Sequence, residues 1–435
     1  MYDFSSSPVV AEADVVVCGA GPGGMGAAYL AGKSGLSVAV IEKAGRPGGM
    51  AANCEVMPFM SSALNNRPID APVYDRWVQA IYSYQSDSVK ARIDASHGTE
   101  YPRRTFTAAV ASLAAEDLFL EAGSKMLYHH TIIGCVKENS NIKSVVVHSK
   151  SGIGQVKGKM FVDCTGDADL AALAGAPYEE GNAEGFCQPM TTCFKLANLK
   201  FPYESIRTPE FAQLYQKLHK EAQERGDLSC VRENLLTFPT MYKDTVHFNT
   251  TRVCEHSATD GVSLAEAEII GRKQVREYLK WMRNDLPGFE DAELTNMGDI
   301  GIRESRRVLG EYYLTADELV NCCKFPDAIA RCNYQVDIHN PRGTGTILKV
   351  IPPGDFYEVP YGCIVPQKID NLTVGGRPIS ADVAAHSSLR IMPTACSIGQ
   401  AAGLAAALAV KLNTIPRKLD GKMVREELKK AGAEL

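Results

Sequence analysis

The chain has 435 residues, of which 45% are hydrophobic and 22% charged, and its formal net charge is −5 with a pI near 6.0. This length predicts two or three domains, and the composition is typical of a globular enzyme. A chain with this charge has no basic field for a phosphate backbone, so we expect no nucleic-acid partner.

The start of the chain carries no targeting pattern. Residues 1–12 lack the cationic start and apolar core of a signal peptide, and the late apolar run 401–410 is too short to span a bilayer. The thirteen cysteines are scattered and include no C-x-x-C pair, which indicates reduced thiols rather than a disulfide framework or a metal site. We therefore expect a cytoplasmic protein with no metal and no membrane insertion.

A strand, a glycine-rich turn and a helix follow one another near the N-terminus. Residues 14–18 are an apolar run, small residues at helical spacing continue to residue 34, and the turn between them reads Gly19-Ala20-Gly21-Pro22-Gly23-Gly24. In this context Gly19 makes the tight turn, Gly21 lets the backbone approach a pyrophosphate, and Gly24 brings the helix close to the sheet. The N–H groups of the first helical turn then face the phosphates.

A second strand at residues 37–41 ends at Glu42, twenty-three positions after Gly19, and Lys43 follows. A carboxylate here accepts hydrogen bonds from ribose hydroxyls and repels a 2′-phosphate, which indicates NAD or FAD rather than NADP. The loop ending in Gly48-Gly49-Met50 comes too soon for an ordinary crossover helix. Its adjacent glycines suit a second portion of an extended ligand, which favours FAD.

The middle of the first domain is predicted to hold helices at 71–84 and 107–122, a strand at 127–136 and a hairpin around residues 151–152. The hairpin's second strand runs into Thr165-Gly166-Asp167 and a helix of small residues. A turn at the carboxyl end of a strand is a place where backbone passes close to a ligand. We expect this turn to contact the cofactor.

The character of the chain changes between residues 179 and 357. Charged helices are predicted at 209–225 and 263–283, with capping boxes at Ser263/Glu266 and Thr315/Glu318, and strand-like runs occur at 190–199 and 247–253. We interpret 179–357 as an inserted α+β substrate or cap domain. The α/β, Rossmann-like cofactor domain, a central parallel sheet with helices and a small antiparallel sheet, then consists of residues 1–178 and 358–435.

Residues 358–435 again show a strand followed by a glycine turn and a helix of small residues, as residues 1–178 do. A strand at 370–374 leads to Gly376 and Arg377, and Arg390-Ile391-Met392-Pro393 leads into a helix of small residues at 394–410. The positive N-terminus of that helix is suited to stabilise the anion of a reduced flavin. Ser388, Arg390 and Ile391 are accordingly predicted contacts of the flavin.

Together these motifs resemble the FAD-dependent oxidoreductase family of the glutathione-reductase superfold, with a distant similarity to fumarate reductase flavoproteins. The matching segments lie along nearly the whole chain: the two glycine loops with Glu42, then residues 162–181, 300–315, 327–331, 336–341, 374–380 and 388–403. The resemblance implies non-covalent FAD, an open cofactor face under the inserted domain and hydride transfer at the flavin N5. It leaves the substrate open.

Two features separate the chain from better-known flavoenzymes. No cysteine pair follows Gly49, which excludes a disulfide reductase, and Cys54 is a lone thiol near the predicted flavin ring. No second complete G-x-G-x-x-G motif occurs, so a dedicated NADPH domain is not expected. The electron acceptor or donor is left as oxygen, a quinone, a carrier or a transiently bound nicotinamide.

The candidate catalytic residues lie in the predicted insertion. His339 and Asp337 are two positions apart in an extended run, hence on one side of it, and His339 could act as acid or base near neutral pH. Arg303 and Arg306, with Arg307, offer cations for a carboxylate or enolate. The alternatives are a structural histidine and arginines paired with Glu304 and Glu311. Arg252 and His386 are weaker candidates.

The leading interpretation is an FAD enzyme that transfers a hydride to or from a small polar organic substrate, in either direction. The alternative is a nucleotide-binding protein that holds NAD or FAD structurally or consumes it, as in a thiazole-synthase-like protein. A non-catalytic protein resembling Rab escort proteins is disfavoured because every glycine loop is retained. A homo-oligomer is compatible with the sequence.

Overall fold

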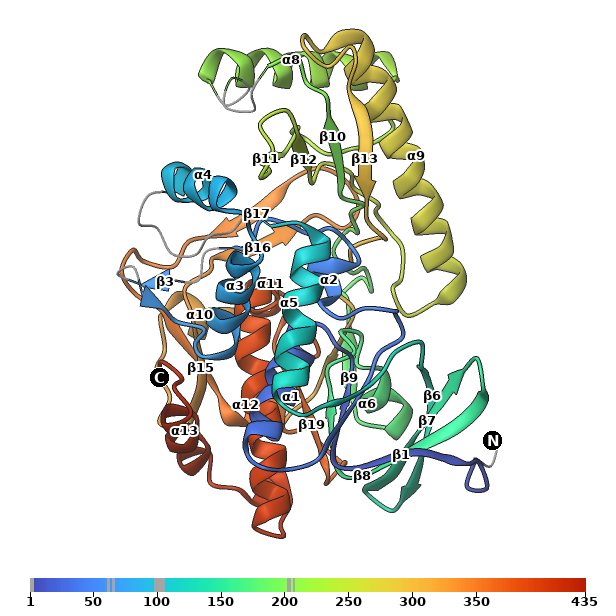
Figure 1. Ribbon diagram of the computed structural model, residues 1–435, viewed down its shortest axis with the longest axis vertical. Helices are drawn as coiled ribbons and strands as arrows, with labels where there is room; N and C mark the ends of the chain where they lie inside the picture. Colours follow the sequence, from blue (N-terminus) through green and yellow to red (C-terminus); the bar gives the residue numbers. More distant parts are fainter. Residues whose placement is uncertain (1–3, 61–62, 65–66, 98–105, 202–204, 206–207) are drawn as a thin grey trace.

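A seven-stranded sheet organises the lower part of the molecule in the computed structural model, which describes residues 4–435 except 61–62, 65–66, 98–105, 202–204 and 206–207 (Figure 1). Its order is β5-β2-β1-β8-β7-β6, and β19 pairs with β8 outside this path. The strands are β1 Val9–Cys18, β2 Val38–Ile41, β5 Lys125–Leu127, β6 Thr131–Glu138, β7 Asn141–Ser149, β8 Gly152–Asp163 and β19 Leu372–Val374.

The sheet has a parallel part and an antiparallel part. The pairs β5–β2, β2–β1, β1–β8 and β8–β19 are parallel, whereas β6–β7–β8 is antiparallel. Val15, Val16, Val17 and Cys18 are all fully buried, which is what a parallel strand covered on both faces requires. The predicted α/β fold with a central parallel sheet and a small antiparallel extension is therefore confirmed.

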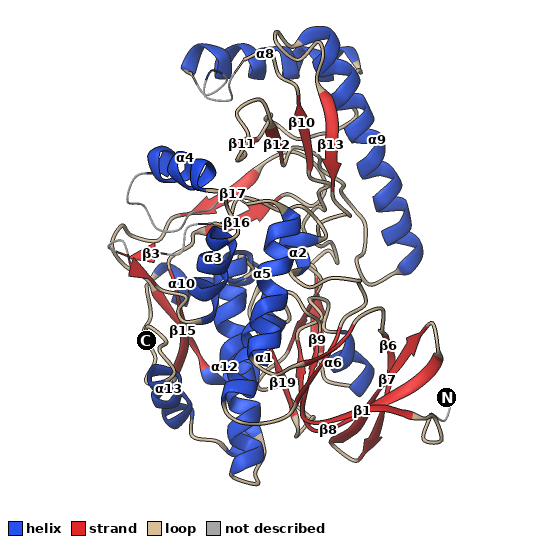
Figure 2. Ribbon diagram, in the orientation of Figure 1, coloured by secondary structure: helices blue, strands red, loops and turns tan. Residues whose placement is uncertain are grey.

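Two helices of small residues, α1 (Pro22–Lys33) and α12 (Met392–Lys411), pack against each other and on the parallel strands (Figure 2). A Cβ on Gly399 would lie 1.9 Å from the carbonyl oxygen of Gly23, and one on Gly403 would lie 2.1 Å from that of Ala27. The two helices can approach this closely because glycine occupies the contact. By length and hydropathy α12 could cross a membrane, but 89% of that window is buried in the protein.

Several shorter helices and a small hairpin complete the first half of the chain. They are α2 Gly49–Ala52, α3 Val73–Ser83, α4 Asp87–His97, α5 Ala108–Glu121 and α6 Asp169–Ala174, with β3 Ala63–Leu64 paired to β4 Arg67–Pro68. The predicted helices 71–84 and 107–122 correspond to α3 and α5. Helix α4 was not predicted, because it carries few apolar residues to reveal a helical period.

The upper part of the molecule is a second sheet, here called the cap sheet, of order β11-β12-β10-β13. Its strands are β11 Thr237–Pro239, β12 Val246–Phe248, β10 Phe194–Ala197 and β13 Glu293–Met297, and helices α8 Pro209–Arg225 and α9 Gly261–Asp285 accompany it. Phe194 and Phe248 stack with ring centroids 4.9 Å apart in a separate apolar cluster that also includes Tyr278 and Trp281 of α9.

The second apolar cluster is smaller than the predicted insertion. It draws on residues 194–292, whereas the apolar residues of 308–359 pack in the same cluster as the central sheet. The domain boundaries at 178 and 357 stay a prediction. What the structure describes is a cap built around β10, β12 and α9, joined to a larger body.

Short paired strands and helices connect the two parts. They are β9 Tyr178–Glu180 with β14 Arg306–Val308, β15 Ala328–Cys332 with β18 Tyr357–Pro360, β16 Val336–His339 with β17 Thr346–Lys349, helices α10 Ala316–Val320, α11 Val383–Leu389 and α13 Gly421–Lys430, and the 3-10 turns Tyr361–Ile364 and Pro416–Lys418. The strand β16 carries both Asp337 and His339.

One of the two predicted capping boxes is correct. Glu318 Oε2 accepts a hydrogen bond from Thr315 N at 2.8 Å at the start of α10. The box at Ser263 is wrong, because Asp260 is the N-cap of α9 and its carboxylate accepts from Ser263 N at 2.7 Å. The helix begins two residues earlier than predicted, because Asp260 accepts from the N–H of Ser263 that the predicted box assigned to the Glu266 side chain.

Candidate functional site

Four glycine-bearing turns that are far apart in the sequence lie against one another. A Cβ added to Gly19 would stand 2.4 Å from Cys164 O, and one added to Gly49 would stand 2.8 Å from Gly21 Cα. The turn at residues 375–377 joins them, because a Cβ on Gly23 would stand 2.9 Å from the carbonyl oxygen of residue 375. The predicted convergence of these loops is therefore present in the fold.

Two helices begin at this junction without a side-chain cap. The N-cap of α1 is Gly21, which has no side chain, and the N-cap of α12 is Ile391, whose side chain has no acceptor atom. Pro22 and Pro393 occupy first-turn positions, where a missing N–H costs nothing. Uncapped N-termini favour anions, so the cradle fits a pyrophosphate at α1 and a reduced flavin at α12.

Glu42 lies at the edge of the cradle and is buried. Its two carboxylate oxygens accept hydrogen bonds from Ala20 N and Ala44 N, each at 2.8 Å. The carboxylate therefore also fixes the first glycine turn against the tip of β2. Because each oxygen retains a second lone pair, the predicted hydrogen bonds to ribose hydroxyls are still available to it.

The turn Thr165-Gly166-Asp167 is held in place by Asp163 and Arg377. Asp163 is buried and accepts from Thr165 Oγ1, at 2.8 Å, and from a backbone N–H of α6, and burial raises its pKa to about 6. Arg377 donates to Gly166 O at 2.7 Å and lies 2.7 Å from Asp167 Oδ1. Arg377 thus braces two of the predicted cofactor turns against each other.

The remaining predicted cofactor residues differ in exposure and in the hydrogen-bonding groups that they have free for a flavin nucleotide. Lys43 is exposed beside Glu42, and Met50 is partly buried in α2. Ser388 is fully buried, and its hydroxyl donates to Tyr334 O at 2.5 Å while lying 2.6 Å from Tyr357 Oη. Its single proton is committed inside the protein, which leaves Ser388 no donor for a flavin.

A group of four arginines surrounds His339. They are Arg232, Arg252, Arg303 and Arg390, which come from four separate segments. Burial, and then the charges of these four arginines, lower the pKa of His339 far below its usual range. Arg232 and Arg252 are buried, while Arg303 and Arg390 retain some exposed surface. We call these four side chains the arginine cluster. Sequence reasoning did not single out Arg232, and no local motif marks it.

The hydrogen bonds of His339 define its tautomer. Arg252 Nη2 and Thr346 Oγ1 lie 3.2 Å and 3.1 Å from His339 Nδ1. A guanidinium can only donate, so Nδ1 is the acceptor and the ring proton resides on Nε2, which is 3.5 Å from Asp337 Oδ1. The role of His339 as an acid or base stays a prediction; burial and the four neighbouring cations lower its pKa, which favours a neutral imidazole in the resting site.

The arginine cluster carries more positive charge than its carboxylates balance. Arg252 lies 3.3 Å from the exposed Glu233, and Arg390 lies 3.7 Å from Asp337 Oδ2. Arg303 donates instead to Pro189 O and Thr191 Oγ1, and neither Arg303 nor Arg232 has an ion-pair partner within the described part of the chain. Glu233 acts on Arg232, and Asp337 on Arg303, only from beyond ion-pair distance. The cluster thus keeps an excess of positive charge, which is unfavourable unless an anion joins it.

Unused hydrogen-bond donors lie in the same region. In the part of the chain that the structure describes, Arg232 Nη1, Arg390 Nε and Gln188 Nε2 are buried atoms without a partner. Gln188 is adjacent to His339, because its Oε1 accepts from His339 N at 3.1 Å. All three atoms are hydrogen-bond donors, so a ligand that carries acceptor atoms would satisfy them.

Two of the candidate arginines lie away from this cluster. Arg306 donates to Asp167 O and Asp169 Oδ1, both at 3.0 Å, so its guanidinium faces the Thr165–Asp167 region rather than His339. Arg307 is fully buried and pairs with Glu304 at 2.5 Å. The ion-pair alternative thus describes Arg307, although Glu311 pairs with Arg417 instead.

The thiol chemistry of the site is unremarkable. All thirteen cysteines are free. Cys54 is buried, its Sγ lies 3.5 Å from Ile300 O, and burial raises its pKa to about 12. Because the thiolate is the reactive form, Cys54 is an inert packed residue.

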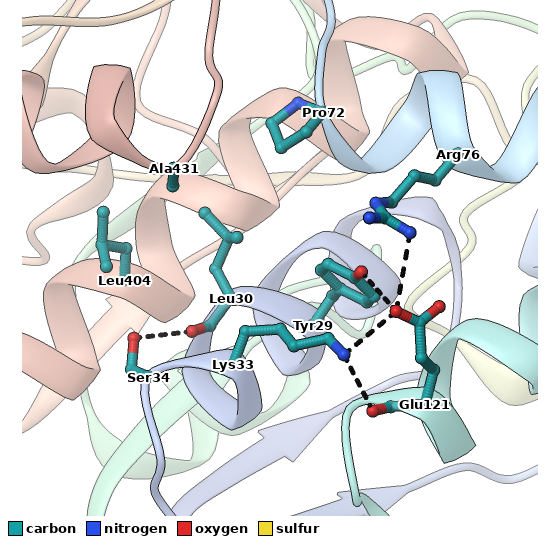
Figure 3. Close-up of a pocket in the computed structure, with 9 residues that line it drawn as sticks. All are labelled: Tyr29, Leu30, Lys33, Ser34, Pro72, Arg76, Glu121, Leu404 and Ala431. Atoms are coloured by element: carbon teal, nitrogen blue, oxygen red, sulfur yellow. Dashed lines mark hydrogen bonds and ion pairs between the residues drawn. The ribbon is translucent and has the colours of Figure 1, made fainter.

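A surface hollow near the other end of α1 is separate from this site (Figure 3). Lys33 and Arg76 both lie near Glu121 Oε1, at 3.0 Å and 3.5 Å, and both approach the ring of Tyr29. These cations are paired and none of the glycine turns reaches the hollow. It contributes nothing to the cofactor cradle.

Comparison with known proteins gives one family. A family model described as "FAD dependent oxidoreductase" matches residues 14–428. No protein among those with curated functions matches the chain.

Similar solved structures include a geranylgeranyl bacteriochlorophyll reductase-like protein from Thermoplasma acidophilum (12% identity, 97% of this chain and 83% of that chain, TM-score 0.46). A flavin-dependent brominase (12%, 96% and 83%, 0.47) and L-proline dehydrogenase from P. horikoshii (14%, 97% and 99%, 0.41) are also similar. At these identities and TM-scores the likenesses carry no inference about the reaction.

Proposed function

The chain belongs to the FAD-dependent oxidoreductase family, and from this premise we propose that it transfers a hydride between the flavin N5 and a small substrate bearing a carboxylate. The observation that carries the proposal is the arginine cluster, with four guanidinium groups against two carboxylates. FAD, held by the four glycine turns and the N-termini of α1 and α12, supplies the redox chemistry when bound. The chain's own side chains then bind and orient the acid.

Arg303 and Arg232 are the groups best placed to bind the substrate carboxylate. Neither lies at ion-pair distance from a carboxylate of the described residues, and Arg232 Nη1 is an unused donor. A hydrogen bond between charged groups contributes about 1.5–3 kcal/mol, and an uncompensated buried cation costs several kcal/mol. A bound carboxylate therefore satisfies both arginines, whereas a neutral isostere leaves their charge uncompensated.

His339 and Asp337 are proposed to handle the proton. The Nε2–H of the neutral His339 donates to a substrate oxygen, and Arg252 keeps the ring in that tautomer. Asp337 is the nearby carboxylate that can take up a proton, and Tyr334 Oη donates to its Oδ2 at 3.1 Å. Because the substrate anion offsets the neighbouring cations, the pKa of His339 rises on binding.

An anaerobic screen of flavin bleaching tests this proposal. Small hydroxy, amino and unsaturated acids are compared with their methyl esters, which keep the shape and lose the charge. We expect bleaching by at least one acid, none by its ester, and loss of the response in Arg303→Gln, with Arg283→Gln of α9 as the matched control. Equal bleaching by acid and ester would contradict the proposal.

The same preparation addresses the rival in which FAD is consumed. A redox enzyme returns to the oxidised spectrum on admission of an electron acceptor and turns over repeatedly. A protein that consumes its nucleotide loses it after one turnover, which flavin released on denaturation would measure.

A further inference from the structure

The inner face of the cap sheet carries polar residues opposite its apolar face, together with the ring of Phe238, which is paired in register with His247 and has its centroid 6.1 Å from that of the imidazole. In β10 and β12 the residues Phe194 and Phe248 are paired in register and pack into the cap's apolar cluster. Because side chains alternate along a strand, Lys195 and His247, which are also paired in register, lie on the opposite face. Lys195 forms a buried ion pair with Glu55, which follows the second glycine loop by a few residues. This face is therefore turned towards the cofactor cradle.

His247 on this face is completely buried, and neither of its ring nitrogens has a partner in the described part of the chain. Asn249 follows His247 by two residues and so lies on the same face of the sheet. Its Oδ1 is buried without a partner in the described residues. Its N–H donates to Leu236 O at 3.1 Å, which extends the pairing of β12 with β11. Buried polar atoms are nearly always paired, so unpaired atoms concentrated on one wall call for a ligand or water.

This wall lies close to the arginine cluster, because Arg303 donates to Thr191 Oγ1 at 2.5 Å and Thr191 precedes Cys193 by two residues. Cys193, on the same face as Lys195, is buried and lies within electrostatic range of Arg303, Arg232 and Lys195. Arg232 belongs to both regions. Its charge contributes to the lowered pKa of His339, and its Nε donates to Asn234 Oδ1. The carbonyl oxygen of Asn234 in turn accepts from Thr250, the residue after Asn249. A ligand whose carboxylate rests on Arg232 or Arg303 can extend along this wall.

The chemistry of the wall selects a neutral group. A neutral imidazole offers one donor and one acceptor, and Asn249 Oδ1 offers an acceptor. Lys195, the cation on this face, is already paired with Glu55. Burial and the charge of Lys195 lower the pKa of His247 to about 3, so the ring brings no charge of its own. Among the described residues of this face a second carboxylate would find no free cation, while a hydroxyl or primary amide would satisfy both His247 and Asn249.

We infer that the inner face of the cap sheet is a second substrate subsite, in which His247 and Asn249 receive a neutral hydroxyl or amide at the end remote from the carboxylate. This inference rests on the proposed function. It defines the substrate class as an acid with a distal neutral hydrogen-bonding group, in contrast to a dicarboxylate or a plain fatty acid.

The test compares unsubstituted acids of three to six carbons with the ω-hydroxy acids of equal length, using the flavin absorbance change of the holoenzyme to measure Kd. At one length we expect the hydroxyl to tighten binding about three- to tenfold, the range for a net neutral hydrogen bond. In His247→Leu and in Asn249→Leu the gain should disappear, while the Kd of the unsubstituted acid stays unchanged.

The control variant is His219→Leu. His219 is also buried with a lowered pKa, but its Nε2 is 2.9 Å from Tyr278 Oη inside the cap's apolar part. It should keep the hydroxyl preference. No gain at any length, a gain that survives in both subsite variants, or a dicarboxylate that binds more tightly than the hydroxy acid would overturn the subsite. If unsubstituted acids do not bind at all, the proposed function itself fails, which separates the two results.

Discussion

Replacing Gly399 by alanine tests the contact between α1 and α12 that positions the cofactor cradle. The new Cβ would stand 1.9 Å from Gly23 O and 2.6 Å from Gly23 C and Cα. Since these are backbone atoms, the helices must separate by about 1.5 Å to restore the 3.4 Å of ordinary contact. Gly23 lies in the first turn of α1, so the same displacement opens the proposed pyrophosphate site.

The magnitude follows from two opposing effects. Overpacking of a close contact costs about 3 kcal/mol at the upper end of the usual range, which suits a clash with backbone. Alanine in place of glycine inside a helix returns about 1 kcal/mol. The expected net loss is about 2 kcal/mol in the free energy of unfolding, together with weaker retention of FAD.

Urea unfolding and the flavin content of the purified protein measure both effects. Gly261→Ala is the matched control, because Gly261 begins α9 and an added Cβ meets nothing within 4 Å. The control should keep its FAD and lose no stability. If Gly399→Ala unfolds at the same urea concentration as the control and retains its flavin, the close contact of α1 and α12 does not hold the cradle together.

Three further predictions address buried groups. Asp70 is fully buried with its pKa raised to about 8, so its native form is protonated and the protein loses stability as the pH rises from about 4 to about 8. Thermal melting across that range should therefore show a flatter profile for Asp70→Asn, and identical profiles would contradict it. Glu304→Gln removes the closer of the two carboxylates beside the buried Arg307 and leaves Glu179 at 3.5 Å, so it should cost about 3 kcal/mol by urea unfolding; a loss under about 1 kcal/mol would show that the pair is dispensable. His339→Asn should retain FAD yet slow flavin reduction by a bleaching acid about 100-fold or more, and an unchanged anaerobic rate would reject a role for His339.

The cofactor cradle was predictable from the sequence because its signals are local. The first glycine turn, the strand before it and the helix after it are contiguous, and Glu42 follows at a fixed spacing. The conformation of the strand, the turn and the helix is determined by residues close together in the chain, so one sequence is enough to predict it. The resemblance to a family then indicated that the separate turns meet, which no individual motif states.

The arginine cluster was not predictable in the same way. Arg232, Arg252, Arg303 and Arg390 are separated by tens of residues and lie on different elements, and they meet only through the packing of the cap on the main body. The neutral state of His339 follows from that assembly, since its pKa depends on charges that the sequence cannot place. Spacing alone paired His339 with Asp337, whose Oδ1 lies 3.5 Å from the ring Nε2, but it could not indicate the charge of the ring.

The capping error at α9 has a smaller physical cause. Asp260 and Ser263 are both good N-caps, and sequence alone does not say which one the chain uses. In the structure Asp260 is the N-cap of α9, and the Ser263 hydroxyl accepts from Ser257 N at 2.9 Å. Helix ends are decided by such local competition, which limits how closely boundaries are read from sequence.

The central claim is that the arginine cluster binds the carboxylate of a substrate beside the flavin. The most direct measurement is a crystal structure of the FAD-loaded protein with malonate, a small and unreactive dicarboxylate. The account predicts the flavin in the cradle of glycine turns and a malonate carboxylate bonded to Arg303 or Arg232, in contact with the ring. A flavin ring remote from Arg303, or malonate absent from the arginine cluster at saturating concentration, would contradict it.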